Sequence, residues 1–224
     1  MSTTRVVRFV VKPVVVAAAL VPLGLLVEAT LSNGLGANPI ETVTHATGDW
    51  TLRFLLLTLA VTPLRWLTGR NPLVRFRRML GLFAFFYGTL HLLTYVVLDK
   101  FFAWHEILRD VMHRRFIMVG ALAFTALVPL AATSTAGMIR RMGGRAWQAL
   151  HRLIFLSAAA GVVHYWWLVK ADISKPRMYA EVLGVLFTVR LMVAWRRRQQ
   201  TTARPRPRAS IAASRQSPEA ATGR

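Results

Sequence analysis

Six long apolar runs constrain the fold of this 224-residue chain more than any other feature. A helix needs about 20 mostly apolar residues to cross the hydrocarbon core of a bilayer, and each run approaches that length. None of them alternates as the strands of a membrane β-barrel do. The sequence therefore predicts an all-α, polytopic membrane bundle of six transmembrane helices, with spans at 10–31, 50–67, 80–98, 116–132, 147–169 and 178–195.

The first run also has the features that begin a secretory signal peptide, because Arg5, Arg8 and Lys12 precede it. The apolar part of a signal peptide is about 7–15 residues long and ends at a small-residue cleavage site. This run continues past Pro22 to Leu31, and no convincing cleavage site follows it. We therefore expect a retained helix that is kinked at the proline.

The positive charges indicate the orientation of the spans, since loops on the cytoplasmic side of a membrane are rich in Lys and Arg. Of the 29 Lys and Arg residues, 19 fall on the side of the two termini and seven on the opposite side. This bias predicts that both termini are cytoplasmic. It also explains the formal net charge of +20 as a consequence of topology, so we predict no nucleic-acid partner.

A basic segment follows the last span. Residues 196–224 contain many arginines among prolines, serines, threonines and alanines, with almost nothing to bury. Such a composition is typical of a disordered segment that is attracted to anionic lipid. We therefore divide the chain into a membrane domain at 1–195 and a basic, disordered cytoplasmic tail at 196–224.

Three of the six histidines fall inside the predicted spans, where ionisable side chains are costly and functional by default. They are His91, His151 and His164, whereas the other three lie in predicted outer loops, at His45, His105 and His113. A neutral imidazole between facing helices is a natural axial ligand of haem iron. With no cysteine in the chain, thiolate ligands and covalent c-type haem are excluded.

Other interpretations of the same histidines remain open. Zinc is disfavoured because no His-x-x-x-His pair or acidic third ligand accompanies them. Buried histidines that only hydrogen-bond between helices, in a transporter or an assembly protein, are the competing hypothesis.

Helix geometry limits how these histidines combine. His151 and His164 are 13 residues apart, about 20 Å along a helix, so they cannot ligate the same iron. His91 lies at a depth between those of His151 and His164, so helix geometry does not decide which of them shares an iron with it. A pairing of His91 with His105 has a favourable spacing of 14 residues, but Asp99 indicates that the third helix leaves the lipid before His105.

Four segments, at 55–65, 77–99, 128–134 and 145–172, resemble the ferric-reductase-like transmembrane family. Within that family they are similar to the haem-binding membrane subunits of bacterial methionine sulfoxide reductase systems. The resemblance spans roughly residues 8 to 195, and it implies a protein of the bacterial inner membrane that binds haem b. The family's histidines fall on His91, His151 and His164, with His91 and His164 as the preferred axial pair. His151 is then left for a second haem or for the side where electrons arrive.

The resemblance further implies that the protein binds FMN and takes electrons from quinone or from a cytoplasmic flavin reductase. It would pass them to a periplasmic, molybdopterin-containing catalytic subunit. The sulfoxide chemistry belongs to that partner, so we predict no catalytic residue in this chain. A flavin phosphate needs positive charge, and the cytoplasmic candidates are Arg77, Arg78, Arg140, Arg141 and Arg145, although topology alone accounts for the same arginines.

Two alternatives remain beside this function. One is a stand-alone ferric or quinone reductase of the same superfamily, which is disfavoured because nothing after Trp195 could fold as a nucleotide-binding domain. The other is a non-redox transporter or assembly protein of the membrane.

Overall fold

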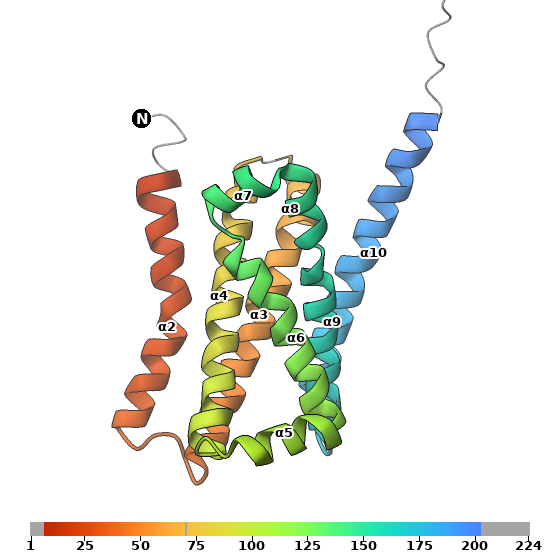
Figure 1. Cartoon of the computed structure of the whole chain (residues 1–224). Coiled ribbons are helices and arrows are strands. Elements are labelled where there is room, and N and C mark those ends of the chain that lie inside the picture. Colours follow the sequence, from red (N-terminus) through yellow and green to blue (C-terminus); the bar gives the residue numbers. More distant parts are fainter. Residues whose placement is uncertain (1–6, 70, 203–224) are drawn as a thin grey trace, which may run out of the picture. The chain divides into compact units, whose positions relative to one another are not determined.

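A computed structural model describes residues 7–69 and 71–202, which form helices and no strand. Figure 1 shows their arrangement, with a short π-helix at Val7–Val11 before α2 and a 3-10 turn at Asn71–Leu73 before α4. The helices are α2 (Lys12–Leu31), α3 (Pro39–Thr68), α4 (Val74–Leu93), η3 (Thr94–Asp99, a π-helix), α5 (Trp104–His113), α6 (Arg115–Ala132), α7 (Ala136–Met142), α8 (Gly144–Leu150), α9 (Leu153–Leu168) and α10 (Ser174–Thr202). The predicted all-α class is therefore confirmed.

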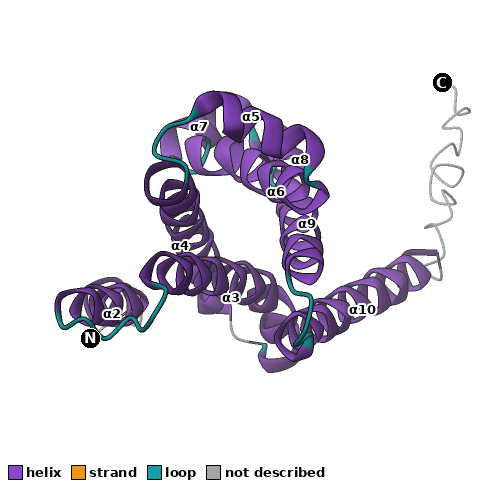
Figure 2. Cartoon of the chain, turned by 90° about the horizontal axis from the view of Figure 1, so that it is seen from below, coloured by secondary structure: helices purple, strands orange, loops and turns teal. Residues whose placement is uncertain are grey.

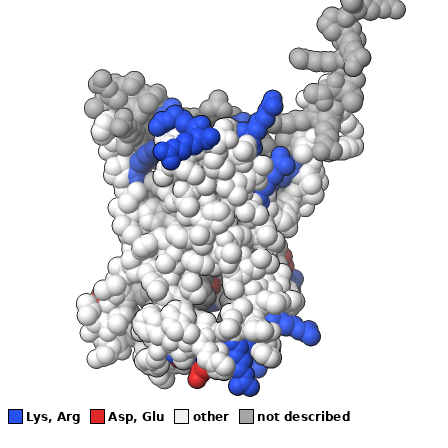
Figure 3. All heavy atoms as spheres, viewed as in Figure 1, with Lys and Arg blue, Asp and Glu red and all other residues white. Residues whose placement is uncertain are grey.

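Among the described residues, five helical stretches are long and apolar enough to cross a membrane, at Phe9–Leu31, Val74–Asp99, Arg115–Ala132, Gly144–Leu168 and Ser174–Arg196. On the face shown in Figure 3, Lys and Arg gather near the two ends and an uncharged band separates them. These features indicate a multi-pass membrane protein. The expected span at 50–67 lies within α3, whose apolar run follows the charged Asp49 and Arg53. A count of six spans and cytoplasmic termini stay predictions.

The chain forms two compact units, Met1–Phe187 and Thr188–Arg224, and α10 continues from the first into the second. Every candidate site residue lies in the first unit. Helix α10 runs to Thr202, so it ends later than the predicted boundary at 195, and the first residues of the expected tail are helical. The rest of that tail, 203–224, lies outside the described residues.

Four helices of the first unit form a closed ring. Helix α3 packs against α4 and α9, and α6 also packs against α4 and α9. Viewed along the helices, α4 and α9 therefore occupy one diagonal of the ring, and α3 and α6 occupy the other (Figure 2). In bundles of this kind, side chains of facing helices meet at the centre.

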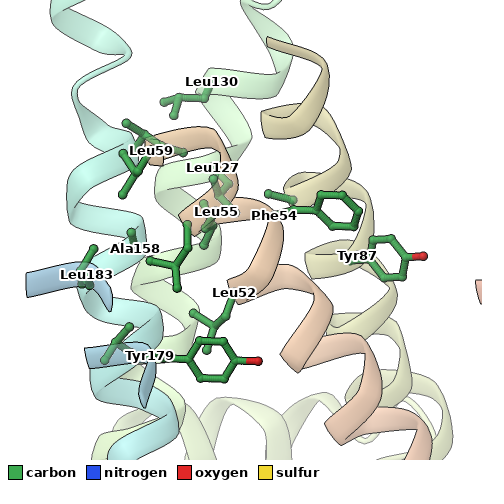
Figure 4. Close-up of a cluster of buried hydrophobic side chains, with 14 of the residues drawn as sticks. Leu52, Phe54, Leu55, Leu59, Tyr87, Leu127, Leu130, Ala158, Tyr179 and Leu183 are labelled. Atoms are coloured by element: carbon green, nitrogen blue, oxygen red, sulfur yellow. The ribbon is translucent and has the colours of Figure 1, made fainter. Parts of the chain in front are cut away.

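The core of this ring is apolar, and all four of its helices contribute to it. Leu52, Leu55 and Leu59 follow one face of α3 and lie in one buried cluster with Leu127 of α6 and Ala158 of α9 (Figure 4). Each of these five side chains is at most 7% exposed. The i, i+3 and i+4 spacings that place them on the inner side of their helices thus hold the ring together.

Local signals fix the two ends of α3. Asn38 caps the helix by accepting a hydrogen bond from the Glu41 amide at 3.3 Å, and Pro39 occupies the first turn, where it costs no hydrogen bond. The helix ends at Thr68 and is followed by Gly69, whose φ of 66° is the left-handed conformation that glycine adopts readily. The helix consequently begins earlier than the predicted span and includes His45, so the prediction of a loop at His45 is wrong.

Two further segments differ from the sequence-based prediction. The fifth apolar run is not one helix, because α8 ends at Leu150 and α9 begins at Leu153, with the chain turning at His151 and Arg152. The connection after η3 is not a plain loop, because it contains the ten-residue helix α5. His105 and His113 lie on this helix, and both are exposed.

Candidate functional site

His91 of α4 and His164 of α9 meet between the diagonal helices of the ring. Their ring centroids are 6.1 Å apart, and their planes cross at 80°. Each residue lies near the end of its helix that faces α5, with His91 two residues before the end of α4 and His164 four residues before the end of α9. The structure thus brings together two of the three intramembrane histidines that the sequence singled out.

Backbone carbonyl groups fix both imidazoles from the other diagonal of the ring. His91 Nδ1 lies 2.9 Å from the carbonyl oxygen of Thr44 on α3, and His164 Nδ1 lies 2.6 Å from that of Phe116 on α6. A carbonyl oxygen only accepts, so each Nδ1 carries the hydrogen and donates it. This tautomer leaves the lone pair of each ring on Nε2, which is the arrangement of metal-bound histidines whose second nitrogen is anchored.

A glycine stands one helical turn after each of these carbonyl groups. Gly48 follows Thr44 by four residues on α3, and Gly120 follows Phe116 by four on α6. A Cβ at Gly48 would lie 3.1 Å from the His91 ring, and one at Gly120 would lie only 2.7 Å from His164 Nδ1. Because residues i and i+4 share a helix face, the missing side chain is what lets the imidazole reach the carbonyl.

The spacing of the two rings suits a shared metal ion. A metal–imidazole bond is about 2.0–2.1 Å long and the bonded nitrogen lies about 1 Å from the ring centroid, so two imidazoles on one ion have centroids about 6 Å apart. The observed 6.1 Å agrees with that value. No group of three or more His, Asp and Glu side chains able to hold a metal ion occurs among residues 7–69 and 71–202. A two-imidazole site of this kind suits haem iron, whose remaining ligands come from the porphyrin.

Hydroxyl groups tie the backbone at His91 to α3. The Thr94 hydroxyl donates to the carbonyl oxygen of His91 at 2.8 Å, and the hydroxyl oxygens of Thr44 and Thr94 are 3.1 Å apart. Thr94 is the first residue of the π-helix η3, a feature that is frequent at functional sites. Thr44 of α3 therefore makes two contacts, one from its carbonyl oxygen to the imidazole of His91 and one from its hydroxyl to Thr94.

His151 does not share this site. It lies at the turn between α8 and α9, where its ring stacks on Trp147 with centroids 3.9 Å apart. Its Nε2 is 3.2 Å from the hydroxyl oxygen of Thr133, which itself donates to the Pro129 carbonyl oxygen at 2.6 Å. Thr133 follows Phe116 by 17 residues, about 26 Å along α6. His151 therefore lies at the opposite end of the ring from the paired histidines.

The predicted flavin-binding arginines gather at the His151 end. Arg77 and Arg78 lie in the first two turns of α4, Arg140 and Arg141 in the last turn of α7, and Arg145 in the first turn of α8. Arg77 is half-buried and the other four are exposed. Gly143, with a φ of 74°, makes the turn that separates α7 from α8.

Sequence reasoning did not identify the groups that orient the paired histidines. Thr44 and Phe116 act through main-chain oxygens, which leave no trace in side-chain chemistry. Gly48 and Gly120 carried the available signal, since a glycine inside an apolar helix costs stability and suggests close packing. That signal alone does not say which side chain each glycine faces.

Comparison with known proteins adds a family and close relatives. Residues 47–162 match the family described as the ferric reductase like transmembrane component. This region contains His91 and His151, and it ends two residues before His164. It thus covers the ring helices α4 and α6 completely and most of α3 and α9.

Several relatives are similar over most of the chain, and each is named as the haem-binding subunit MsrQ of protein-methionine-sulfoxide reductase. The protein of Herminiimonas arsenicoxydans is 51% identical over 195 residues, which cover 86% of this chain and 89% of the relative. That of Rhodospirillum rubrum is 52% identical over 182 residues, covering 81% and 88%. That of Xanthomonas oryzae pv. oryzae is 47% identical over 203 residues, covering 88% and 91%.

Proposed function

The chain belongs to the ferric-reductase-like transmembrane family and, within it, to the MsrQ group, and from this premise we propose that it is a membrane electron-transfer subunit. In this proposal it binds haem b through His91 and His164. It serves a periplasmic, molybdopterin-containing catalytic subunit that reduces oxidised methionine in envelope proteins. Its membrane is the inner membrane of a bacterium.

The observation that carries the proposal is the His91–His164 pair. Two half-buried imidazoles each donate through Nδ1 to a backbone carbonyl oxygen, which leaves Nε2 free as the ligand atom, and their centroids are 6.1 Å apart. A haem held by these two residues would supply a one-electron carrier, and the hydrogen bonds of the two imidazoles would tune its potential. The chain supplies the orientation of the two ligands through the carbonyl oxygens of Thr44 and Phe116.

The two ends of the ring have different tasks in this proposal. A bilayer core about 30 Å thick separates a cytoplasmic donor from a periplasmic acceptor. His151, Trp147 and the arginines lie at the end where we place arrival of electrons from quinone or a cytoplasmic flavin reductase. The His91–His164 pair lies near the α5 end, from which electrons leave for the partner. The sulfoxide chemistry takes place on that partner.

We also propose that FMN binds at the His151 end. Its support is the gathering of Arg77, Arg140, Arg141 and Arg145 there, together with Arg78, since phosphate groups favour clustered guanidinium groups. If so, replacing Arg140 and Arg141 together by glutamine should lower FMN retention of the purified protein and leave its haem spectrum unchanged. Unchanged FMN content in that variant would contradict this assignment.

A spectrum of the purified protein in detergent tests the haem proposal. The protein should be red and show the sharp reduced-minus-oxidised α-band of a six-coordinate, low-spin haem. His91→Ala and His164→Ala should each abolish that band, whereas His113→Ala on the exposed face of α5 should keep it. A colourless folded protein that stays colourless after reconstitution with haem would favour a transporter or assembly role.

A partner test separates the electron-transfer subunit from a stand-alone reductase. The protein should co-purify with a periplasmic molybdoenzyme encoded by the same organism, and reduced quinone should reduce that enzyme only when this chain is present. Reduction of ferric chelates at full rate with no partner would instead support the stand-alone reductase.

A further inference from the structure

Helix α5 carries an apolar stripe that nothing in the first unit covers. Trp104, Leu108 and Met112 recur every four residues, and their side chains are 65%, 61% and 69% exposed. Directly before the helix, Phe101 and Phe102 are 76% and 54% exposed. Large apolar side chains scattered singly on a surface are ordinary, but a contiguous set of this size marks an interaction surface.

The stripe is one of three faces of the same helix. With 3.6 residues per turn, Trp104, Leu108 and Met112 cover about 80° of the circumference. The face turned to the bundle lies about 100° to one side, and it holds Asp110, which is 8% exposed, with Ile107 and Val111, which are partly buried. The polar face lies about 110° to the other side and holds exposed residues only, namely His105, Glu106, Arg109 and His113.

The rotation of α5 about its axis is fixed by its buried carboxylate. Asp110 accepts a hydrogen bond from the Tyr95 hydroxyl at 2.8 Å and forms ion pairs with Lys100 at 2.9 Å and Arg114 at 3.0 Å. Its side chain is 11% exposed and that of Lys100 is 15% exposed. Because these partners lie before and after α5 and in η3, the stripe cannot turn inward without breaking them.

The position of α5 along the chain decides what meets the stripe. One membrane span, Val74–Asp99, ends just before it, and the next, Arg115–Ala132, begins just after it. The helix runs across the end of the ring from α4 to α6 (Figure 1). A short helix that joins the ends of two adjacent spans lies at the level of the lipid headgroups, where amphipathic helices and Trp side chains are favoured.

From this placement we propose that α5 is an interfacial helix whose stripe of Trp104, Leu108 and Met112 enters the lipid leaflet at that end of the bundle. Phe101 and Phe102 extend the same contact. Both adopt left-handed backbone angles, with φ of 46° and 61°, which bulky residues rarely adopt. The polar face, with Arg109 as its cation, lies toward the headgroup phosphates and the water. The proposal does not depend on haem binding.

The chain contains no cysteine, so single nitroxide labels test the proposal cleanly. Two neighbouring pairs compare the stripe with the polar face of the same helix, Leu108→Cys with Arg109→Cys and Met112→Cys with His113→Cys. Each variant is labelled in nanodiscs of phosphatidylethanolamine and phosphatidylglycerol. Power-saturation EPR then measures collisions with oxygen, which concentrates in lipid, and with a water-soluble nickel chelate.

We expect labels at 108 and 112 to collide several-fold more with oxygen than with the nickel chelate, and labels at 109 and 113 to show the reverse. Equal access of the nickel chelate at all four positions would overturn the proposal. Protection of 108 and 112 from both reagents would also overturn it, because a second copy of the chain or another protein would then cover the stripe. An elution profile identical to that of the unlabelled protein shows that each variant is folded.

Discussion

The two ends of the helical ring treat their histidines differently. At one end, His91 and His164 are held by carbonyl oxygens of the opposite helices, and both present Nε2. At the other end, His151 lies at a chain turn, stacks on Trp147 and uses Nε2 to contact a threonine hydroxyl. In the proposed function, the first end is a fixed ligand site. The second end contains the Trp147 indole and several arginines, which suits the binding of an electron donor or a flavin phosphate.

The largest expected effect is the difference between the alanine variants of His164 and His151, which tests the contrast between the two ends directly. Replacing His164 by alanine removes one of the two proposed haem ligands, so six-coordinate low-spin haem should be lost almost completely. Replacing His151 by alanine should leave that haem in place and slow its reduction by quinol. Absorption and EPR spectra of both variants, followed by stopped-flow reduction, provide the measurement. Equal loss of low-spin haem in both variants would mean that the two ends share one ligand set.

The glycines provide a smaller and graded effect. Gly120→Ala places a methyl group against His164, with overpacking that typically costs about 1–3 kcal/mol. It should also lengthen the bond from Nδ1 to the Phe116 carbonyl oxygen, which makes the imidazole a weaker donor to iron and raises the midpoint potential. Gly48→Ala should act in the same direction but less, since its Cβ meets His91 at 3.1 Å.

Redox titration and thermal unfolding measure this effect. Gly24→Ala in α2 is the matched control, because a Cβ there meets nothing within 4 Å. A shift of the same size in the control would show that the potential responds to helix substitution in general and not to the imidazole.

Thr133→Val tests the His151 end of the ring. Valine keeps the shape of threonine but removes the hydroxyl that contacts His151 Nε2. We expect about 1 kcal/mol lower stability and altered quinol reduction, with the potential of the haem held by His91 and His164 unchanged. Quinol kinetics at several pH values give the measurement. A changed haem potential would show that the ends are coupled through α6.

The smallest expected effect concerns the Asp110 clamp, by which we mean the contacts of Asp110 with Tyr95, Lys100 and Arg114 that hold α5 in place. Burial alone would raise the pKa of Asp110, but hydrogen bonds from Lys100 and Tyr95 and the charge of Arg114 outweigh it and lower that pKa. A hydrogen bond to Asp110 raises the pKa of Lys100. The contribution of the clamp to the stability of the folded protein is therefore constant near neutral pH. It is lost as the pH falls through the lowered pKa of Asp110, below about pH 4.

A label at Leu108→Cys follows the clamp by its EPR mobility. Mobility should rise in acid in the wild-type background and should already be high at neutral pH with Asp110→Asn. An acid step that persists in the Asp110→Asn background would assign the transition to another group.

The amino-acid sequence predicts much of this architecture for physical reasons. Apolar run length predicts the membrane helices, and the cost of an ionisable group in lipid singles out His91, His151 and His164. Sequence spacing excludes a shared iron for His151 and His164. It could not pair His91 with His164, because that pairing depends on how α4 and α9 face each other across the ring.

Other features escaped prediction because they depend on tertiary contacts. The turn at His151 and Arg152 interrupts a run that is long enough to be one span, and contacts of Trp147 and His151 with Thr133 stabilise it there. Helix α5 has mixed composition and only ten residues, so its buried Asp110 and its neighbours decide its position. Asp99 and Lys100 at the end of the third span are equally compatible with a plain loop.

The carbonyl anchors have a consequence for how such a chain tolerates mutation. Every amino acid carries a backbone oxygen, so exchanges at positions 44 and 116 keep the acceptor whatever side chain arrives. Positions 48 and 120 have no such freedom, because any residue larger than glycine intrudes on an imidazole. A saturation library scored by colour should therefore be more permissive at the residues whose carbonyl groups anchor the imidazoles than at the glycines one turn later.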